Sequence, residues 1–149
     1  MAQRRPLTAL GFDFGLRRIG VAVGSTLTGS ARGLAVIRHG EQAPDWTAIA
    51  ALIAEWQPDL AVVGVPYNMD GTRSDLTPRA ERFARQLAGR SGLPVETVDE
   101  RLSSREAEAS LTAERRDRRR TSRVDAGAVD MRAAAVILDR WLAGNTQIP

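Results

Sequence analysis

The sequence predicts an α/β domain built in layers around one mixed sheet. Strand-like and helical segments alternate along the chain, short polar or glycine breaks separate the first three strand-like runs, and LAVVGVP at 60–66 is continuously apolar. Such a run is typical of a central strand that is covered on both faces. With 149 residues, 43% of them hydrophobic, the chain can form its own core, and we expect a single domain over residues 1–149.

The first three strands are expected at 7–14, 18–25 and 33–38. In each run, apolar residues stand between glycine or polar breaks. The connections between the runs are short, and strands joined by short connections pair in the antiparallel sense. The sequence therefore predicts an N-terminal antiparallel meander.

Two amphipathic helices are expected, one before and one after the apolar strand at 60–66 along the chain. The first begins at Pro44 and Asp45 and ends near Trp56, and the second covers about 77–87. The apolar positions of the first are Trp46, Ile49, Ala50, Ile53 and Trp56. Those of the second are Ala80, Phe83, Ala84 and Leu87.

The C-terminal third predicts one more strand and two more helices. The strand is expected at 94–100, and Ser103 with Glu106 three residues later is a capping pattern that begins a helix. The final helix is expected from about 127 to 143. Its buried stripe consists of Ala133, Ala134, Ile137, Leu138 and Trp141.

Composition excludes several classes of site. There is no cysteine, which excludes disulfides, thiolate nucleophiles and cysteine-ligated zinc. The basic residues are 21 arginines with no lysine, which excludes Schiff-base lysines and phosphate-loop NTPases. No apolar run approaches the ~20 residues of a membrane helix, and the N-terminus lacks a signal-peptide pattern. We expect a cytoplasmic protein that does not enter a membrane.

The positive charge is concentrated in one segment. The net charge is +3, but ERRDRRRTSR at 114–123 holds six arginines and two acidic residues, so this segment carries +4 and the rest −1. Such a segment resembles a nucleic-acid contact, and the alternative is a solvated helix end followed by a loop. The arginines are Arg115, Arg116, Arg118, Arg119, Arg120 and Arg123.

Asp13 stands out because it interrupts a buried strand. In GFDFG at 11–15 it lies between two phenylalanines. An unpaired carboxylate in such a place costs several kcal/mol or more, so it requires a cation, hydrogen-bond donors or a metal. Arg17 and Arg18 are the nearest candidate ion-pair partners along the chain.

Two further acidic positions lie at the ends of apolar elements. Extending the stripe of the final helix back by one turn reaches Asp130, which either points to the covered side or offsets the helix dipole. Asp99 and Glu100 follow the last strand, at an edge where α/β sheets form sites. For these two, the alternative is an ion pair with Arg101 or a helix-dipole contact.

Three carboxylates without cysteine or a set of histidines select hard divalent cations such as Mg²⁺ or Mn²⁺. Two such ions about 3.5 to 4 Å apart can hydrolyse a phosphodiester without lysine or histidine. The single histidine, His39, is expected at the end of the third strand and receives no catalytic role.

Four blocks of the sequence resemble, in order, the signature blocks of the YqgF/RuvX family: GFDFGLRRIGVAV at 11–23, VVGVPYNMDGT at 62–72, DERLSS at 99–104 and VDMRAAAVIL at 129–138. Its members are RuvC-like, described as Holliday junction resolvases and as the nuclease acting on pre-16S rRNA. The resemblance implies an RNase H-like three-layer domain, with a mixed five-stranded sheet and helices on both faces.

The resemblance also implies that Asp13, Glu100 and Asp130 form a metal-binding catalytic triad for Mg²⁺ or Mn²⁺, with two ions expected. Asp99 would be a supporting neighbour. The family commonly carries basic residues just before the third aspartate, where this chain has Gly127 and Ala128. Asp125 also follows a valine, but only Asp130 is in register with the apolar stripe, and Asp125 is interpreted as a helix N-cap.

Other matching positions are candidates for nucleic-acid contacts. Arg17 and Arg18 could hold phosphate oxygens bidentately, with surface solvation as the alternative. Asn68 and Thr72 could line a groove for the backbone, whereas Asp70 and Gly71 are better explained by turn chemistry. We also assign nucleic-acid contacts to Arg101 and to the six arginines of 114–123. Gly15 is expected to allow a tight turn after Asp13.

The substrate class is less sharply indicated. Only seven aromatic residues are present, so binding should depend on phosphate contacts, with steep salt dependence and little base specificity. Maturation of the 5′ end of pre-16S rRNA is the first hypothesis. Resolution of branched DNA is the second, and it would favour a homodimer. A non-catalytic RNA-binding maturation factor is a third. An actin-like ATPase or sugar kinase is disfavoured. Those proteins enclose a nucleotide between two lobes of this kind of fold, and 149 residues supply one lobe.

Overall fold

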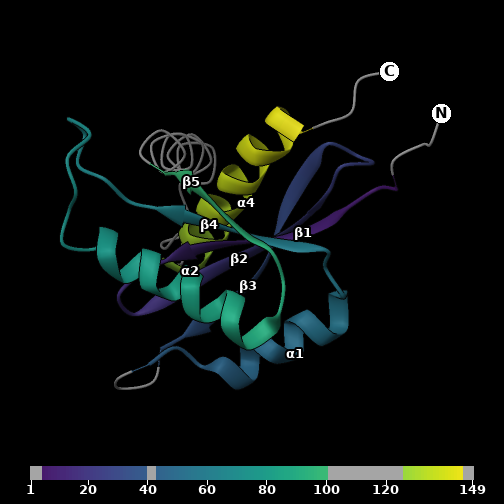
Figure 1. Cartoon of the computed structure of the whole chain (residues 1–149), viewed down its shortest axis with the longest axis horizontal. Coiled ribbons are helices and arrows are strands. Elements are labelled where there is room, and N and C mark those ends of the chain that lie inside the picture. The colour runs from purple at the N-terminus through teal and green to yellow at the C-terminus, as the bar shows by residue number, and fades with distance from the viewer. Residues whose placement is uncertain (1–4, 40–42, 101–125, 146–149) are drawn as a thin grey trace, which may run out of the picture.

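The computed structural model describes residues 5–39, 43–100 and 126–145 of the chain. Within these residues five strands form one sheet in the order β3-β2-β1-β4-β5 (Figure 1). The strands are β1 (Thr8–Phe14), β2 (Arg18–Ser25), β3 (Ser30–Arg38), β4 (Leu60–Val65) and β5 (Val95–Asp99).

The sheet is mixed, as the sequence predicts. β1, β2 and β3 pair in the antiparallel sense, and β1 pairs with β4 and β4 with β5 in the parallel sense. β1 is therefore the central strand, with the meander on one side and the parallel pair on the other. Gly15 closes the first hairpin: its N–H donates to the Arg18 carbonyl at 3.0 Å, and a Cβ at Gly15 would lie 2.6 Å from that oxygen.

Helices cover both faces of the sheet and give three layers. α1 (Trp46–Trp56) and α2 (Thr77–Ser91) pack on one face, and α4 (Ala126–Asn145) packs on the other (Figure 1). Alternation along β1 sends Leu10, Phe12 and Phe14 into the core beneath α1 and α2, and sends Ala9 toward α4. Odd-numbered residues of β1 therefore face α4, and Asp13 is one of them.

The predicted elements are present, with shifted ends. β3 begins three residues earlier than expected, at Ser30, and α2 continues to Ser91. α2 ends there because Gly92 adopts a left-handed conformation with φ of 74° and its N–H donates to the Ala88 carbonyl. The capping pattern at Ser103 and the N-cap interpretation of Asp125 lie outside the described residues.

The buried stripes of α2 and α4 are confirmed. All four predicted residues of α2 and all five of α4 are buried. In α1 the apolar spacing and the burial do not coincide throughout: Ala50 is exposed, and only Ile49 is fully covered. Within the described residues, no helix is long and apolar enough to cross a membrane.

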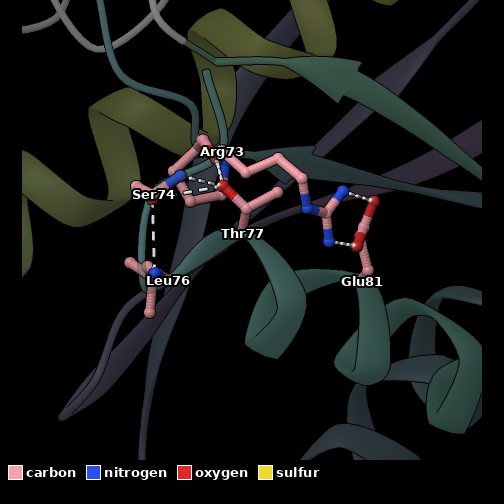
Figure 2. A network of polar contacts seen from close by, with 6 residues as sticks. Arg73, Ser74, Leu76, Thr77 and Glu81 are labelled. Carbon is pink, nitrogen blue, oxygen red and sulfur yellow. Dashed lines mark hydrogen bonds and ion pairs between the residues drawn. The ribbon is translucent and has the colours of Figure 1, made fainter. Parts of the chain in front are cut away.

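A buried hydroxyl fixes the start of α2 to the end of β4. Thr77 is fully buried, and its Oγ1 donates to the Pro66 carbonyl and accepts the Ser74 N–H at 2.9 Å. Figure 2 shows this network together with the bidentate ion pair of Arg73 and Glu81, at 2.5 and 3.2 Å. The loop between β4 and α2 is thereby tied down at both its ends.

Replacing Thr77 tests this connection. Thr77→Val keeps the shape but removes the hydroxyl, leaving the Pro66 carbonyl and the Ser74 N–H without that partner. We expect it to lower the free energy of unfolding by about 1–3 kcal/mol. Thr77→Ser keeps the hydroxyl and should lose only ~0.8 kcal/mol for the missing methyl. Urea denaturation measures both. An equal loss in the two variants would show that the hydroxyl contributes nothing.

Candidate functional site

Asp13 lies at the centre of the sheet on the face that α4 covers. Its neighbours in register are glycines on both sides, Gly20 of β2 and Gly64 of β4. A Cβ at Gly20 would lie 2.0 Å from the Asp130 carbonyl oxygen, and a Cβ at Gly64 would lie 2.9 Å from Glu100 Oε2. The two glycines therefore leave the space in which the backbone of Asp130 and the carboxyl of Glu100 approach the sheet on either side of Asp13.

Glu100 directly follows β5 and is held there by the backbone. Its N–H donates to the Val65 carbonyl of β4 at 3.1 Å, which continues the parallel ladder of β4 and β5 by one bond and fixes Glu100 at the end of the sheet. The side chain is hydrogen-bonded to Asp13. Its Oε2 atom is buried and has no hydrogen-bond partner among the described residues.

The two carboxyls share one proton. Burial raises the pKa of Glu100 to about 10, helped by the hydrogen bond to Asp13 and by the negative charges of Asp13 and Asp99. Burial also raises the pKa of Asp13, and the charge of Asp130 adds to this, while the hydrogen bond from Glu100 opposes it. In the metal-free protein the pair therefore favours holding one proton between the two carboxyls over having both of them ionised.

Asp130 lies on the first part of α4 and is paired with an arginine. Arg18 Nε donates to Asp130 Oδ2 at 2.7 Å, and both side chains are partly exposed. From the sequence, Arg18 is a candidate ion-pair partner of Asp13 and a candidate contact to the phosphates of a nucleic acid. The structure pairs it with Asp130, because alternation along β2 and the position of α4 bring these two side chains together.

The donor set fits a hard divalent cation in part. It consists of oxygen atoms only, and the unpartnered Oε2 of Glu100 beside Asp13 is the kind of buried atom that a bound ion satisfies. Among the described residues, no three acidic or histidine side chains are already arranged to hold a metal. Since Asp130 is paired with Arg18, the pre-formed part is the pair of Asp13 and Glu100.

The predicted nucleic-acid contacts are distributed differently. Arg17 is exposed beside Arg18 at the start of the second strand. Arg101 and the six arginines of 114–123 lie outside the described residues and stay predictions.

The loop at 68–72 is an exposed turn held by its own side chains. Asp70 Oδ1 accepts the N–H of Thr72 at 2.9 Å and its hydroxyl at 2.6 Å, and Asn68 Nδ2 donates to that hydroxyl at 2.9 Å. Gly71 has a φ of 90°. This confirms turn chemistry for Asp70 and Gly71. From the sequence, Asn68 and Thr72 are candidates for contacts with the nucleic-acid backbone. The structure shows that their side chains form hydrogen bonds within the turn.

Comparison with known proteins places the chain in a family. Residues 7–144 match the family model described as RuvX, Holliday junction resolvase. The chain belongs to this family. A relative from Azotobacter vinelandii, named "Putative pre-16S rRNA nuclease", is 52% identical over 93% of this chain and 94% of its own. A relative of the same name from Pseudomonas aeruginosa is 50% identical over 96% of this chain and 97% of its own.

The RuvX fold is that of the RuvC-type resolvases. The structure of Thermus thermophilus RuvC matches with a TM-score of 0.55 over 94% of this chain and 98% of that chain, at 15% identity. The match confirms the RNase H-like architecture that the four sequence blocks imply. Membership of RuvX makes the chain a nuclease, that is, a hydrolase of ester bonds in nucleic acid.

The proton shared by Asp13 and Glu100 predicts a pH-dependent stability in the metal-free protein. Folding raises the pKa of both carboxyls, and that of Glu100 rises from 4.5 in the unfolded chain to about 10. The stabilisation from the bound proton is therefore complete below pH 4.5 and is lost as the pH rises toward about 10. We expect the free energy of unfolding in EDTA to fall between about pH 5 and about pH 9, by up to ~1.4 kcal/mol per pH unit for the one proton that the pair shares.

Glu100→Gln has no proton to lose at this position, so its profile should be flatter and its stability above neutral pH higher than that of the wild type. Glu55→Gln, at an exposed position of α1, is the matched control and should keep the wild-type profile. Urea titrations at several pH values measure the effect. A Glu100→Gln profile that stays parallel to the wild type would contradict the shared proton.

Proposed function

We propose that this RuvX protein is a metal-dependent nuclease that matures the 5′ end of pre-16S rRNA in the cytoplasm. The observation that carries the proposal is the pair of partly buried carboxyls, Asp13 and Glu100, next to Asp130 at a place where Gly20 and Gly64 let helix α4 and Glu100 approach the sheet. The choice of substrate rests on relatives named for this RNA at about half identity over nearly the whole chain.

In the proposed mechanism, Asp13, Glu100 and Asp130 hold Mg²⁺ or Mn²⁺ through their oxygens, with two ions in the complete site. Such ions, when bound, activate a water and stabilise the charge on phosphoryl oxygens. The residues themselves prepare the site. With a cation bound, both Asp13 and Glu100 would be ionised, and the proton that they share would pass to solvent. Helix α4 covers this face of the sheet and shields the two carboxyls in part.

Arg18 has a double role in this proposal. It pairs with Asp130 in the metal-free protein, and with Asp130 bound to a cation its guanidinium would be available to a substrate phosphate. Arginine suits both partners, because its planar guanidinium donates two hydrogen bonds to a carboxylate or a phosphate. Arg17, one residue earlier and exposed, would contact the backbone in either state.

Asparagine variants of the acidic residues test the proposed triad. Asp13→Asn and Asp130→Asn should each reduce Mn²⁺-dependent cleavage of a precursor rRNA fragment by more than about 100-fold. Loss of a residue that only hydrogen-bonds to a metal ligand typically costs roughly 10–100-fold, and loss of a ligand itself should cost more. Mn²⁺ should raise the melting temperature of the wild type but not of Asp13→Asn. Glu55→Gln serves as the control. Cleavage that persists in EDTA, or in both variants, would overturn the triad.

Competition between Arg18 and the metal can be measured without cleavage. Arg18→Gln frees Asp130, so we expect Mn²⁺ to bind about 3–10-fold more tightly in isothermal titration calorimetry, in line with the ~1 kcal/mol of a partly exposed ion pair. Arg17→Gln removes the same charge one residue away and should change the affinity much less. Equal effects in the two variants would mean that net charge, rather than the pairing with Asp130, controls metal binding.

The alternative substrate is branched DNA. The family model is described as a Holliday junction resolvase, and this favours a four-way junction as the second substrate in the same assay. A junction with two-fold symmetry would also call for a symmetric homodimer. Cleavage of the junction but not of the RNA, by a protein that is dimeric in light scattering, would replace the rRNA proposal. Binding of RNA without cleavage of either would support a non-catalytic maturation factor.

A further inference from the structure

A second candidate site lies at the same end of β1 as Asp13 but on the opposite face of the sheet. It is a cavity of about 550 Å³. One wall is formed by Phe14 and Leu16, which come directly after Asp13 along the chain, and another by the outer side of α2. A strand of substrate that reaches the acidic residues over the end of the sheet would therefore pass this cavity.

The cavity is strongly basic. Arg79, Arg82 and Arg90 line it, and none of its lining residues is acidic. Among the described residues no ion pair involves these three arginines, and the nearby Glu81 is taken by Arg73 at 2.5 Å. Three positive charges with no acidic residue among the lining give the cavity a positive potential, which favours an anionic ligand.

A neighbouring ring orients one of the basic groups. The Arg90 guanidinium lies 4.6 Å from the centre of the Trp46 ring, and Trp46 stacks on Phe83 with ring centres 5.4 Å apart. Trp46 is thus already in contact with both Arg90 and Phe83, which leaves little of its ring for a nucleobase. The chemistry of the cavity therefore suits phosphate groups better than bases.

A polar atom without a partner adds to this. His39 also lines the cavity, and its Nε2 is buried with no hydrogen-bond partner among the described residues. Its ring is held edge-on against Phe14 at 5.2 Å. A buried polar group left unsatisfied costs about 1–3 kcal/mol, which points to a partner that completes this wall.

We propose that this cavity binds the phosphate backbone of the nucleic-acid strand that the acidic site cleaves. The spacing of the arginines favours a polymer over a single phosphate. Arg79 and Arg90 are three turns apart on α2, about 16 Å at 1.5 Å per residue, which spans several phosphates of a strand. The identity of the ligand rests on the nuclease function proposed above, but its recognition needs no metal.

The test is binding without catalysis. The full chain is titrated onto a fluorescent precursor rRNA fragment in EDTA at several salt concentrations, and anisotropy gives the affinity. We expect Arg79→Gln/Arg82→Gln to weaken binding about tenfold or more near 0.1 M salt. It should also reduce the slope of log affinity against log salt by roughly 1.5, because each lost phosphate contact removes ~0.7 to 0.9.

The matched control removes two charges elsewhere. Arg85 is exposed on α2 and Arg140 lies on α4, and neither lines the cavity. Arg85→Gln/Arg140→Gln should retain most of the affinity and of the salt slope. Circular dichroism melts verify that both double variants are folded. Equal losses in the two, or no loss in either, would overturn the proposal.

Two further measurements distinguish this proposal from a mononucleotide-binding site and from the nuclease proposal. Adenosine monophosphate is added to wild type and to Arg79→Gln/Arg82→Gln in thermal melts. Stabilisation of the wild type alone, with unchanged RNA affinity, would make the cavity a mononucleotide site and overturn the backbone proposal. If the wild type binds RNA through these arginines but cleaves nothing with Mn²⁺, the nuclease proposal fails while the phosphate site is supported.

Discussion

The close approach of α4 to the centre of the sheet is the constraint on which the rest of the structure depends. The Asp130 carbonyl lies where a side chain at position 20 would be, so a helix can lie this near β1 and β2 only because Gly20 has no Cβ. This approach carries the Asp130 side chain beside Arg18. On the other flank of Asp13, Gly64 leaves the equivalent space for Glu100. The two glycines therefore permit the close packing that places Asp130 and Glu100 on either side of Asp13.

The charges at the site are balanced in two separate ways. Asp13 and Glu100 are hydrogen-bonded to each other and reduce their repulsion by sharing a proton, whereas Asp130, which is likewise partly buried, is paired with Arg18. Neither arrangement satisfies every atom, since Glu100 Oε2 keeps no partner among the described residues. A divalent cation is the kind of ligand that would replace both the proton and the guanidinium, and this makes the site responsive to metal in the proposed function.

β1 connects this acidic site to the basic cavity on the other face. Successive residues of a strand point to opposite sides, so Asp13 faces α4 and Phe14 lies on the other face, where it lines the cavity together with arginines of α2. The two proposed contacts with nucleic acid, metal at one and arginines at the other, would then lie around one edge of the same strand. Such an arrangement would bind the sugar-phosphate backbone of the nucleic acid without contacting the bases. This agrees with the small number of aromatic residues in the chain.

The sequence alone determined the order of strands and helices, the antiparallel meander and the apolar stripes of α2 and α4, because these depend on periodicities of two and 3.6 residues within short segments. It also singled out Asp13, Glu100 and Asp130, as acidic residues at the ends or inside of apolar elements and through the four family blocks. Only the tertiary structure decided that Arg18 meets Asp130, that Ala50 is exposed, and that arginines of α2 line a cavity beside Phe14. These depend on the register and packing of segments far apart along the chain, which local periodicity does not encode.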